Sequence, residues 1–322
     1  MNKLLVLCGP TAIGKTSVGI KLAKKFSGEI ISADSRQVYK GMDIGTGKDI
    51  KKSSKFKVQS SKNFDVGYYE IEFIPVWLLD MAEPDKQVTV ADWKAGAEIV
   101  ISQLIKENKL PIVVGGTGFY IQALVDGIDT LGIPPNEQLR QQLSDWPVEK
   151  IRNKLKNLDA EVYQKLNRSD RHNPHRLIRK IEIAMAKENS QYHSSNYNTG
   201  GWQGEVLEIG LTAPNQYIYQ RIDHRVEQRL EDGLLEEINI LLAKGYGWDD
   251  PGLNTLAYKE FRDYFENNQS LKECVQRWKY DEHGYARRQL TWFKGDEKIN
   301  WFDITQDKWI DDLEKMVHNW YS

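Results

Sequence analysis

The sequence predicts an α/β protein in which a doubly wound parallel sheet is interrupted by a helical insertion domain. Three observations predict this fold. Short apolar runs alternate with helical patterns through the first part of the chain, which is typical of a parallel sheet with helices on both faces. A glycine-rich stretch follows the first apolar run, and residues 128–195 carry helical patterns but no strand pattern. We therefore expect a core of residues 1–127 and 196–322 and an insertion of residues 128–195.

The individual elements follow from the spacing of apolar residues. Short apolar runs predict strands at Lys3–Cys8, Glu29–Ser32, Val76–Leu79, Pro111–Val114 and Glu205–Leu211. Apolar residues at helical spacing predict helices at Ser17–Phe26, Trp93–Glu107, Asn215–Lys244, Thr255–Phe265 and Leu271–Phe293. The polar stretch Lys51–Phe64 is expected to form an exposed loop, and Gln191–Gly201 has the composition of a linker.

The composition excludes several classes of protein. Of the 322 residues, 40% are hydrophobic and 28% are charged, and the formal net charge is −2. These values disfavour a disordered chain and a protein that binds nucleic acid through its overall charge. Cys8 and Cys274 lack metal-ligand spacing, and Leu4–Cys8 is too short for a signal peptide or a membrane span. We expect a cytoplasmic protein outside the membrane, in which any nucleic-acid site is a local basic patch.

A motif after the first apolar run predicts a phosphate-binding loop. It matches the pattern G-x-x-x-x-G-K-[ST] in full, with Gly9, Pro10, Thr11, Ala12, Ile13, Gly14, Lys15 and Thr16. The glycines let backbone N–H groups approach a diphosphate, and the following helix adds the positive end of its dipole. Lys15 offers a positive charge to the outer phosphate, and the Thr16 hydroxyl is a candidate ligand for Mg²⁺. The context disfavours a chance glycine-rich turn and predicts a P-loop fold.

The P-loop alone does not identify the reaction, because kinases, GTPases and transferases that release diphosphate all use it. The segment Asn153–Lys156 lacks the aspartate of a guanine-binding motif, which disfavours a GTPase. Asp34 directly follows the second strand and should face the loop, since the carboxyl ends of parallel strands share one edge. There its carboxylate could accept the proton of an attacking nucleophile. The alternative is a helix N-cap without a chemical role.

The chain resembles the tRNA dimethylallyltransferases in motifs that follow the family's order along nearly its whole length. These motifs are Gly9–Thr16, Asp34–Thr46, Val114–Tyr120, Asn173–Glu182, Tyr258–Glu260 and Tyr285–Phe293. The first is generic, whereas the second and the last are quite specific. The chain departs from the family pattern at four places. Ala257 stands for a usual glycine, Val76-Trp77 for two histidines and Arg287 for a lysine, and the polar stretch from Lys51 is longer than usual.

The resemblance implies an enzyme that moves a dimethylallyl group from its diphosphate to N6 of the tRNA adenosine immediately 3′ of the anticodon. It implies that Asp34 is the general base, that Thr117 meets the substrate near the reacting centre, and that Arg221 clamps the diphosphate. Arg225 is a second candidate for the clamp. The residues expected to line the adenine pocket, beside Asp34, are Ser35, Arg36 and Gln37. The implied partners are dimethylallyl diphosphate and the tRNA anticodon stem-loop, with Mg²⁺ as cofactor, and we expect a monomer.

Two further stretches are candidates for contact with the tRNA. Basic residues cluster within Lys165–Lys180, where Arg176 and Arg179 share one helical face; a solvated helix surface is the alternative. The resemblance adds a second set of expected tRNA-binding residues, namely Tyr258, Lys259, Arg287, Arg288 and Gln289. The seven-residue spacing of aromatic side chains predicts a stripe that faces the core, formed by Trp278, Tyr285 and Trp292.

Three other functions stay open at this point. A small-molecule nucleotide kinase would share the P-loop, transfer phosphate from ATP and need no polynucleotide. An adenylate isopentenyltransferase would act on free AMP, which the large basic C-terminal half disfavours. An RNA-binding protein without catalysis is disfavoured because Lys15, Thr16 and Asp34 are all present.

Overall fold

The chain forms two compact units. The first comprises Met1–Asp126 and Gly201–Ser322, and the second comprises Gly127–Gly200, which contains the stretch where the sequence predicts an insertion. The computed structural model describes residues 2–48, 50, 57–61, 64–188 and 198–322. Among these residues, no helix combines the length and the apolar character needed to cross a membrane.

The first unit is built on an eight-stranded sheet with the order β3-β4-β5-β2-β6-β1-β7-β8. Its strands are β1 (Lys3–Cys8), β2 (Gly28–Ala33), β3 (Lys57–Ser61), β4 (Asp65–Ile71), β5 (Ile74–Trp77), β6 (Leu110–Gly115), β7 (Glu205–Thr212) and β8 (Asn300–Asp303). The pairs from β5 to β8 are parallel, whereas β4 pairs antiparallel with both β3 and β5. The predicted parallel sheet is confirmed, and it carries an antiparallel extension at one edge that the sequence did not predict.

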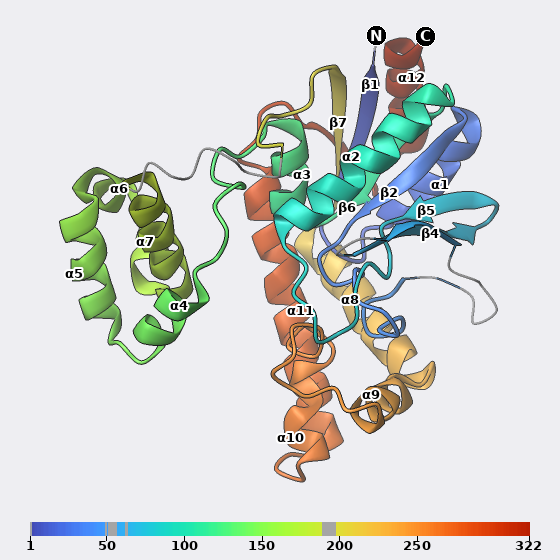
Figure 1. Ribbon diagram of the computed structural model, residues 1–322. Coiled ribbons are helices and arrows are strands. Elements are labelled where there is room, and N and C mark those ends of the chain that lie inside the picture. The colour runs from blue at the N-terminus through green and yellow to red at the C-terminus, as the bar shows by residue number, and fades with distance from the viewer. Residues whose placement is uncertain (1, 49, 51–56, 62–63, 189–197) are drawn as a thin grey trace. The chain divides into compact units, whose positions relative to one another are not determined.

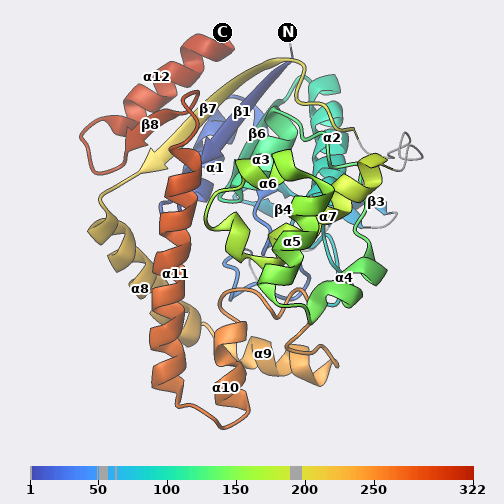
Figure 2. The same cartoon turned by 90° about the vertical axis from the view of Figure 1, so that its left-hand side faces the viewer.

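The first unit also contains eight α-helices among its described residues, some of which cover the two faces of the sheet. They are α1 (Lys15–Lys25), α2 (Val90–Lys106), α3 (Gly118–Val125), α8 (Asn215–Glu231), α9 (Leu234–Ala243), α10 (Arg262–Phe265), α11 (Leu271–Phe293) and α12 (Trp309–Tyr321). In Figure 1, α2 and α3 lie over one face, and α1 and α12 lie over the other. The two termini lie at the same end of the sheet (Figure 2), where Lys3 Nζ donates to the carbonyl of Trp320 at 2.5 Å.

The central strands bring three turns to one edge of the sheet. Cys8 at the end of β1 lies opposite Gly115 at the end of β6, and Ala33 at the end of β2 also lies opposite Gly115. The P-loop, Asp34 and Thr117 follow these three strands. Because parallel strands end at the same edge, these residues emerge side by side.

A buried tryptophan holds α2 and α3 next to this edge. Trp93 of α2 is fully buried and stacks on Tyr120 of α3 with 4.6 Å between the ring centroids. Its Nε1 donates to the carbonyl of Ser32 at 2.8 Å, so the polar end of the ring is also satisfied. Burial of a large apolar side chain stabilises a fold by about 1.5–3 kcal/mol. Trp93 therefore fixes the helices against the end of β2, two residues before Asp34.

Three expected elements differ from the structure. β3 occupies Lys57–Ser61, inside the stretch expected to be an exposed loop; residues 51–56 and 62–63 lie outside the described residues, as does most of the expected linker Gln191–Gly201. The helix expected at Asn215–Lys244 is divided into α8 and α9. Gly233 between them has φ of +101°, which ends the helical geometry at a residue that adopts this conformation without steric cost.

The helix expected at Thr255–Phe265 is also wrong. Its first part forms turns, followed by a 3₁₀ turn at Lys259–Phe261 and the short α10. The cause lies at Ala257, which has φ of +78° and whose N–H donates to Glu260 Oε2 at 2.8 Å. This left-handed conformation is one that glycine adopts more easily, which accounts for the glycine usual at this place in the family that the sequence resembles.

The second unit has its own core. Its helices include α4 (Glu137–Ser144), α5 (Val148–Leu158), α6 (Ala160–Lys165) and α7 (Pro174–Glu188), whose apolar faces pack together. Glu182 of α7 is only 3% exposed and accepts hydrogen bonds from Arg140 Nε at 2.7 Å and Arg179 Nη1 at 3.1 Å. Burial opposes ionisation of Glu182, but these bonds outweigh it and hold its pKa below the ordinary value. A paired, buried carboxylate thus anchors α4 to α7.

Candidate active site

The P-loop has the geometry that its motif predicts. Gly9 has φ of +142°, and a Cβ at this position would lie 2.5 Å from the carbonyl oxygen of Leu211. Gly14 has φ of +98° and precedes the first residue of α1, Lys15. The strand, tight turn and helix therefore point the N-terminus of α1 into the pocket, where the helix dipole favours an anion.

Lys15 is held inside the loop. Its Nζ donates to the carbonyl of Pro10 at 2.7 Å. Burial lowers the pKa of Lys15 to about 8, although the negative charge of Asp34 opposes this shift. Lys15 is therefore positively charged at neutral pH, but a small rise in pH is enough to begin removing its proton.

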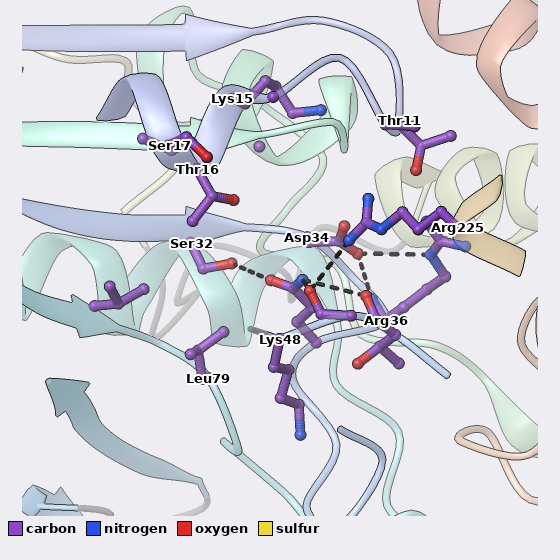
Figure 3. Close-up of a pocket in the computed structure, with 18 of the residues that line it drawn as sticks. Thr11, Lys15, Thr16, Ser17, Ser32, Asp34, Arg36, Lys48, Leu79 and Arg225 are labelled. Carbon is purple, nitrogen blue, oxygen red and sulfur yellow. Dashed lines mark hydrogen bonds and ion pairs between the residues drawn. The ribbon is translucent and has the colours of Figure 1, made fainter. Parts of the chain in front are cut away.

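Asp34 does not cap a helix. The residues that follow it form bends and turns, and Asp34 Oδ1 accepts the backbone N–H of Arg36 at 2.9 Å. Figure 3 shows its side chain across the pocket from Thr11, Lys15 and Thr16. This placement excludes the N-cap alternative and leaves the carboxylate facing the P-loop.

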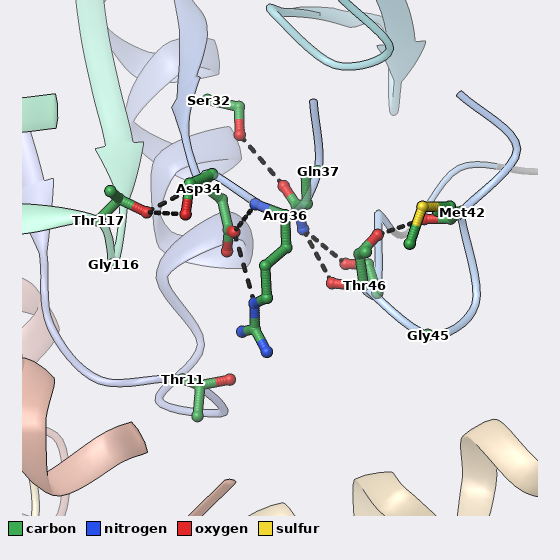
Figure 4. Close-up of polar contacts among 12 residues, drawn as sticks. Thr11, Ser32, Asp34, Arg36, Gln37, Met42, Gly45, Thr46, Gly116 and Thr117 are labelled. Atoms are coloured by element: carbon green, nitrogen blue, oxygen red, sulfur yellow. Dashed lines mark hydrogen bonds and ion pairs between the residues drawn. The ribbon is translucent and has the colours of Figure 1, made fainter. Parts of the chain in front are cut away.

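Thr117 is joined to the loop that carries Asp34. Its Oγ1 accepts the N–H of Ser35 at 3.0 Å and donates to Ser35 Oγ at 3.3 Å (Figure 4). Gln37 joins this loop to two further segments. Its Oε1 accepts from Ser32 Oγ at 3.1 Å, and its Nε2 donates to the carbonyl of Gly47 at 3.0 Å. The loop from Asp34 to Thr46 is therefore fixed at both ends before any substrate binds.

Gln289 of α11 has a different role from the one expected. It was expected to contact tRNA, but it is 5% exposed. Its Oε1 accepts the N–H of Thr11 at 2.8 Å, and its Nε2 donates to the carbonyl of Gly116 at 2.9 Å. Gln289 therefore positions the P-loop against the end of β6 and does not present its amide to a nucleic acid.

The expectation for Tyr258 also differs from the structure. It was expected to contact tRNA, but it is fully buried, and its hydroxyl donates to Glu237 Oε1 at 2.6 Å. Glu237 in turn accepts the N–H groups of Asp43 and Ile44 at 2.8 Å each. The Tyr258–Glu237 pair thus fixes the backbone at Asp43 and Ile44, in the loop that follows Asp34. Neither residue has a local sequence pattern that reveals this contact.

Cations from α8 complete the phosphate end of the pocket. Arg221 Nε donates to the carbonyl of Ala12 at 2.7 Å, which places its guanidinium beside the P-loop as expected. Arg225 and His224 line the same cavity, and Arg225 Nη2 lies 3.4 Å from the carbonyl of Gly47. The sequence identified Arg225 only as a second candidate, and it gave no reason to single out His224.

These elements enclose a cavity of about 370 Å³, a size suited to a small-molecule ligand. One wall is polar and carries the P-loop, Asp34 and Arg221. Another wall is apolar and is formed by Ile30, Ile71, Val76 and Leu79. Lys48 also lines the cavity and was not expected. Its side chain is buried and donates to Asp43 Oδ1 at 2.7 Å and to Asp80. These bonds fix the Lys48 side chain in the lining of the cavity. The cavity can therefore accept a ligand in which an anion is joined to a small apolar group.

The remaining expected residues lie outside this cavity. Arg176 and Lys259 are exposed, whereas Arg179 is turned inward and donates to the carbonyls of Thr130 and Ile133 at 3.2 and 2.8 Å. Arg287 Nη1 donates to Tyr219 Oη at 2.9 Å. Arg288 is exposed, and its guanidinium lies 5.9 Å from the ring of Tyr285.

The expected aromatic stripe on α11 is only partly correct. Trp278 is fully buried, but Trp292 is 50% exposed. Trp292 contacts the ring of Phe119 edge-on at 6.4 Å, and Phe119 is itself exposed. The seven-residue spacing therefore failed near the end of the helix, where two aromatic rings form a surface pair.

Comparison with known proteins gives a consistent result. A family model described as IPP transferase matches residues 37–296, and one described as Isopentenyl transferase matches residues 2–60. A curated tRNA dimethylallyltransferase of Anoxybacillus flavithermus is 36% identical over 95% of this chain and 92% of its own length.

Solved structures agree. A tRNA Δ(2)-isopentenylpyrophosphate transferase of Staphylococcus epidermidis has a TM-score of 0.67 and 30% identity and covers 99% of both chains. A tRNA isopentenylpyrophosphate transferase of Bacillus halodurans has a TM-score of 0.65 and 30% identity, and covers 99% of this chain and 96% of its own.

Proposed function

The chain belongs to the IPP transferase family, and from this we propose that it is a tRNA dimethylallyltransferase. The reaction moves a dimethylallyl group from dimethylallyl diphosphate to N6 of the adenosine immediately 3′ of the tRNA anticodon and releases diphosphate. One observation carries the proposal: a single cavity holds the P-loop, a facing carboxylate at Asp34 and an apolar wall. This combination suits a short apolar group linked to a diphosphate.

The proposed step is a substitution at the first carbon of the dimethylallyl group. The N6 lone pair forms the new C–N bond, the C–O bond to the diphosphate breaks, and Asp34 accepts the proton that N6 loses. Adenine N6 is a weak nucleophile because its lone pair is delocalised into the ring. The charge that develops on the leaving diphosphate is stabilised by Lys15 and Arg221 together with the N-terminus of α1. Thr117, whose Oγ1 accepts the N–H of Ser35 beside the base, is the residue proposed to contact the reacting nitrogen.

The adenosine must leave its base stack to reach this cavity, at a cost of a few kcal/mol. The basic surface of the second unit offers compensating contacts with tRNA phosphates. Arg176 is 57% exposed in its side chain and pairs with Asp170. We include Lys259, Arg287 and Arg288 in the proposed tRNA contacts, because their side chains are exposed.

Replacing Arg176 by alanine is expected to weaken binding of an anticodon stem-loop and to reduce the slope of log Kd against log salt by about one. Binding is measured by fluorescence anisotropy at several salt concentrations. Arg262→Ala is the matched control, since Arg262 is likewise exposed and paired, with Asp249 and Glu266, but is not among the proposed tRNA contacts. An unchanged salt slope for Arg176→Ala would contradict the proposed contact. Arg179→Ala should instead lower the stability of the second unit by about 1–3 kcal/mol, because it removes the hydrogen bonds to Glu182 and to the partly buried carbonyls of Thr130 and Ile133.

Mg²⁺ is the proposed cofactor. Within the described residues, no group of three His, Cys, Asp or Glu side chains could hold a metal ion. Thr16, however, lines the cavity, and its hydroxyl with diphosphate and water oxygens forms a ligand set that Mg²⁺ accepts. When bound, Mg²⁺ would neutralise charge on the leaving diphosphate.

Thr16→Val is therefore expected to raise the Mg²⁺ concentration needed for half-maximal diphosphate binding by about tenfold. Thr16→Ser keeps the hydroxyl and should behave as the parent chain. Calorimetric titration of diphosphate at several Mg²⁺ concentrations measures the effect without relying on turnover. If binding and transfer both survive thorough chelation, this cofactor assignment is wrong.

One assay tests the function as a whole. The protein is incubated with unmodified tRNA, Mg²⁺ and either labelled dimethylallyl diphosphate or labelled ATP, and the label in RNA is counted. We expect label only from dimethylallyl diphosphate, and its loss when the target adenosine is replaced. Phosphate transfer from ATP would favour a kinase, and transfer to free AMP a different prenyltransferase. We also propose that the reaction takes place in the cytoplasm. Because the residues that line the cavity all belong to the first unit, we further propose that a monomer carries it out.

A further inference from the structure

A buried cluster of charges lies beside Asp34. We name it the charge cluster; it consists of Arg36, Arg229 and Glu282. Arg36 follows β2, Arg229 belongs to α8, and Glu282 belongs to α11. Their side chains are 8%, 8% and 3% exposed. Burial of charges is costly unless they are paired. The pairing of Arg36 and Arg229 with Glu282 therefore decides how their charges act on neighbouring groups.

Arg36 is bonded to Glu282 and only faces Asp34. Its Nη1 donates to Glu282 Oε1 at 3.0 Å, whereas its Nε lies 3.7 Å from Asp34 Oδ1, which is too long for a hydrogen bond. The guanidinium also lies over the ring of Tyr285 at 4.5 Å. Within the described residues, Arg36 Nε has no hydrogen-bond partner. It is therefore free to turn toward Asp34 if the bond to Glu282 is lost.

Glu282 is shared between two cations. Arg229 Nη1 lies 3.9 Å from Glu282 Oε1 and donates to the carbonyl of Gly45 at 2.8 Å. Burial opposes ionisation of Glu282, but Arg36 and Arg229 outweigh it and hold its pKa below the ordinary value. Glu282 is therefore an anion at neutral pH, and it competes with Asp34 for the charge of Arg36.

We propose that Glu282 is a positioning residue that holds Arg36 away from Asp34 and so preserves the basicity of the catalytic carboxylate. This inference rests on the proposed function, in which Asp34 takes the proton from N6. A carboxylate that gains a close guanidinium becomes a weaker base. Without the negative charge of Glu282, Asp34 is the nearest anion to Arg36, and a movement of less than about 1 Å would bring Arg36 Nε into hydrogen-bond distance.

Other titratable groups face Asp34 from the surrounding elements and must be separated from this effect. They are Lys15 at the start of α1, Lys48 in the loop after Asp34, Tyr120 of α3, Arg221, His224 and Arg225 of α8, and Tyr285 of α11. Burial raises the pKa of Tyr285 to about 12, and that of Lys15 lies near 8. Because histidine ordinarily changes its charge between about pH 5 and 8, the comparison is made in a His224→Asn background.

The test measures single-turnover dimethylallyl transfer to an anticodon stem-loop, with both substrates saturating, across the acid limb of the pH–rate profile. Glu282→Gln keeps the shape of the side chain and removes its charge. We expect its acid limb to move to lower pH by about one unit and its plateau rate to fall about 3- to 10-fold. Arg36→Met should move the limb to higher pH. The double variant should behave like Arg36→Met, because Glu282 acts through Arg36, whereas two independent effects would add.

The matched control is Glu227→Gln. Glu227 of α8 pairs with Lys279 of α11 at 2.6 Å and is 59% exposed, so it joins the same two helices at the surface. Its acid limb should not move. Diphosphate affinity and melting temperature show whether each variant is folded. If Glu282→Gln does not fold, the shift of the acid limb in Arg36→Met is the deciding measurement.

An unchanged limb in Glu282→Gln, or in Arg36→Met, would overturn the inference and leave the charge cluster a structural feature. The proposed function fails separately. It fails if the parent chain transfers no dimethylallyl group, and the role of Asp34 fails if Asp34→Ala turns over normally.

Discussion

Asp34→Ala is expected to lower kcat by about 10²- to 10⁴-fold, the usual contribution of a general base. The Asp34 carboxylate faces the P-loop across the cavity, and Thr117 is bonded to its neighbour Ser35. Diphosphate affinity should change little, because Asp34 is not among the cations and N–H groups that bind the anion. The measurement is kcat with both KM values on an anticodon stem-loop.

Asp34→Asn is the control for the structural part of this effect. Its side-chain oxygen can still accept the N–H of Arg36, which Asp34 Oδ1 accepts at 2.9 Å, but it cannot take a proton. We expect Asp34→Asn to be nearly as slow as Asp34→Ala. Recovery of near-normal turnover in the asparagine variant would mean that the residue only shapes the turn.

The part of the site that the sequence predicted is the part that follows strands directly. The P-loop, Asp34 and Thr117 each come after a buried strand, and the ends of β1, β2 and β6 are in register. A local pattern is sufficient to place the P-loop and Asp34, because the geometry of a parallel sheet supplies the rest. Thr117 was expected only from the family resemblance.

The residues that support the site could not be placed in this way. Gln289 bonds to Thr11 across 278 positions of sequence, and no periodicity encodes such a contact. Tyr258 was found only as part of a motif, and its burial depends on Gly45, where a Cβ would lie 2.4 Å from the Tyr258 ring. The motif showed that the residue matters but not whether it faces solvent or the core.

The same limit explains the errors in the fold. The expected loop at Lys51–Phe64 contains β3 because the edge strand gains its hydrogen bonds from β4 and not from an apolar pattern. The break at Gly233 and the left-handed Ala257 are single-residue backbone effects. Such effects interrupt a helical pattern without changing its apolar spacing.

Lys15→Ala is expected to weaken diphosphate binding about 10- to 100-fold, as loss of a charged hydrogen bond does, and to lower kcat about 10²- to 10³-fold. The two effects have one cause, since the ammonium contacts the diphosphate before the reaction and stabilises its charge as it leaves. In the free protein, Lys15 Nζ is bonded to the carbonyl of Pro10, so it must exchange this acceptor for a phosphate oxygen.

The affinity of the parent chain should also depend on pH in a way that identifies Lys15. Its pKa in the free protein is lowered by burial to about 8, and an anion binds the protonated form. As pH rises through 8, binding must therefore take up a proton, and Kd for an unreactive dimethylallyl diphosphate analogue should rise about tenfold per pH unit. Below pH 8 the same group leaves Kd constant.

Lys15→Ala should lack this rise, and the gap between it and the parent chain should close as pH increases above 8. Lys15→Arg is the matched control, because arginine keeps its charge and should hold a constant Kd through the same range. Isothermal titration between about pH 6.5 and 9.5 spans both sides of the lysine titration. A rise near pH 8 that persists in Lys15→Ala would assign the titrating group elsewhere in the cavity, and equal affinities at pH 7 would show that Lys15 does not bind the diphosphate.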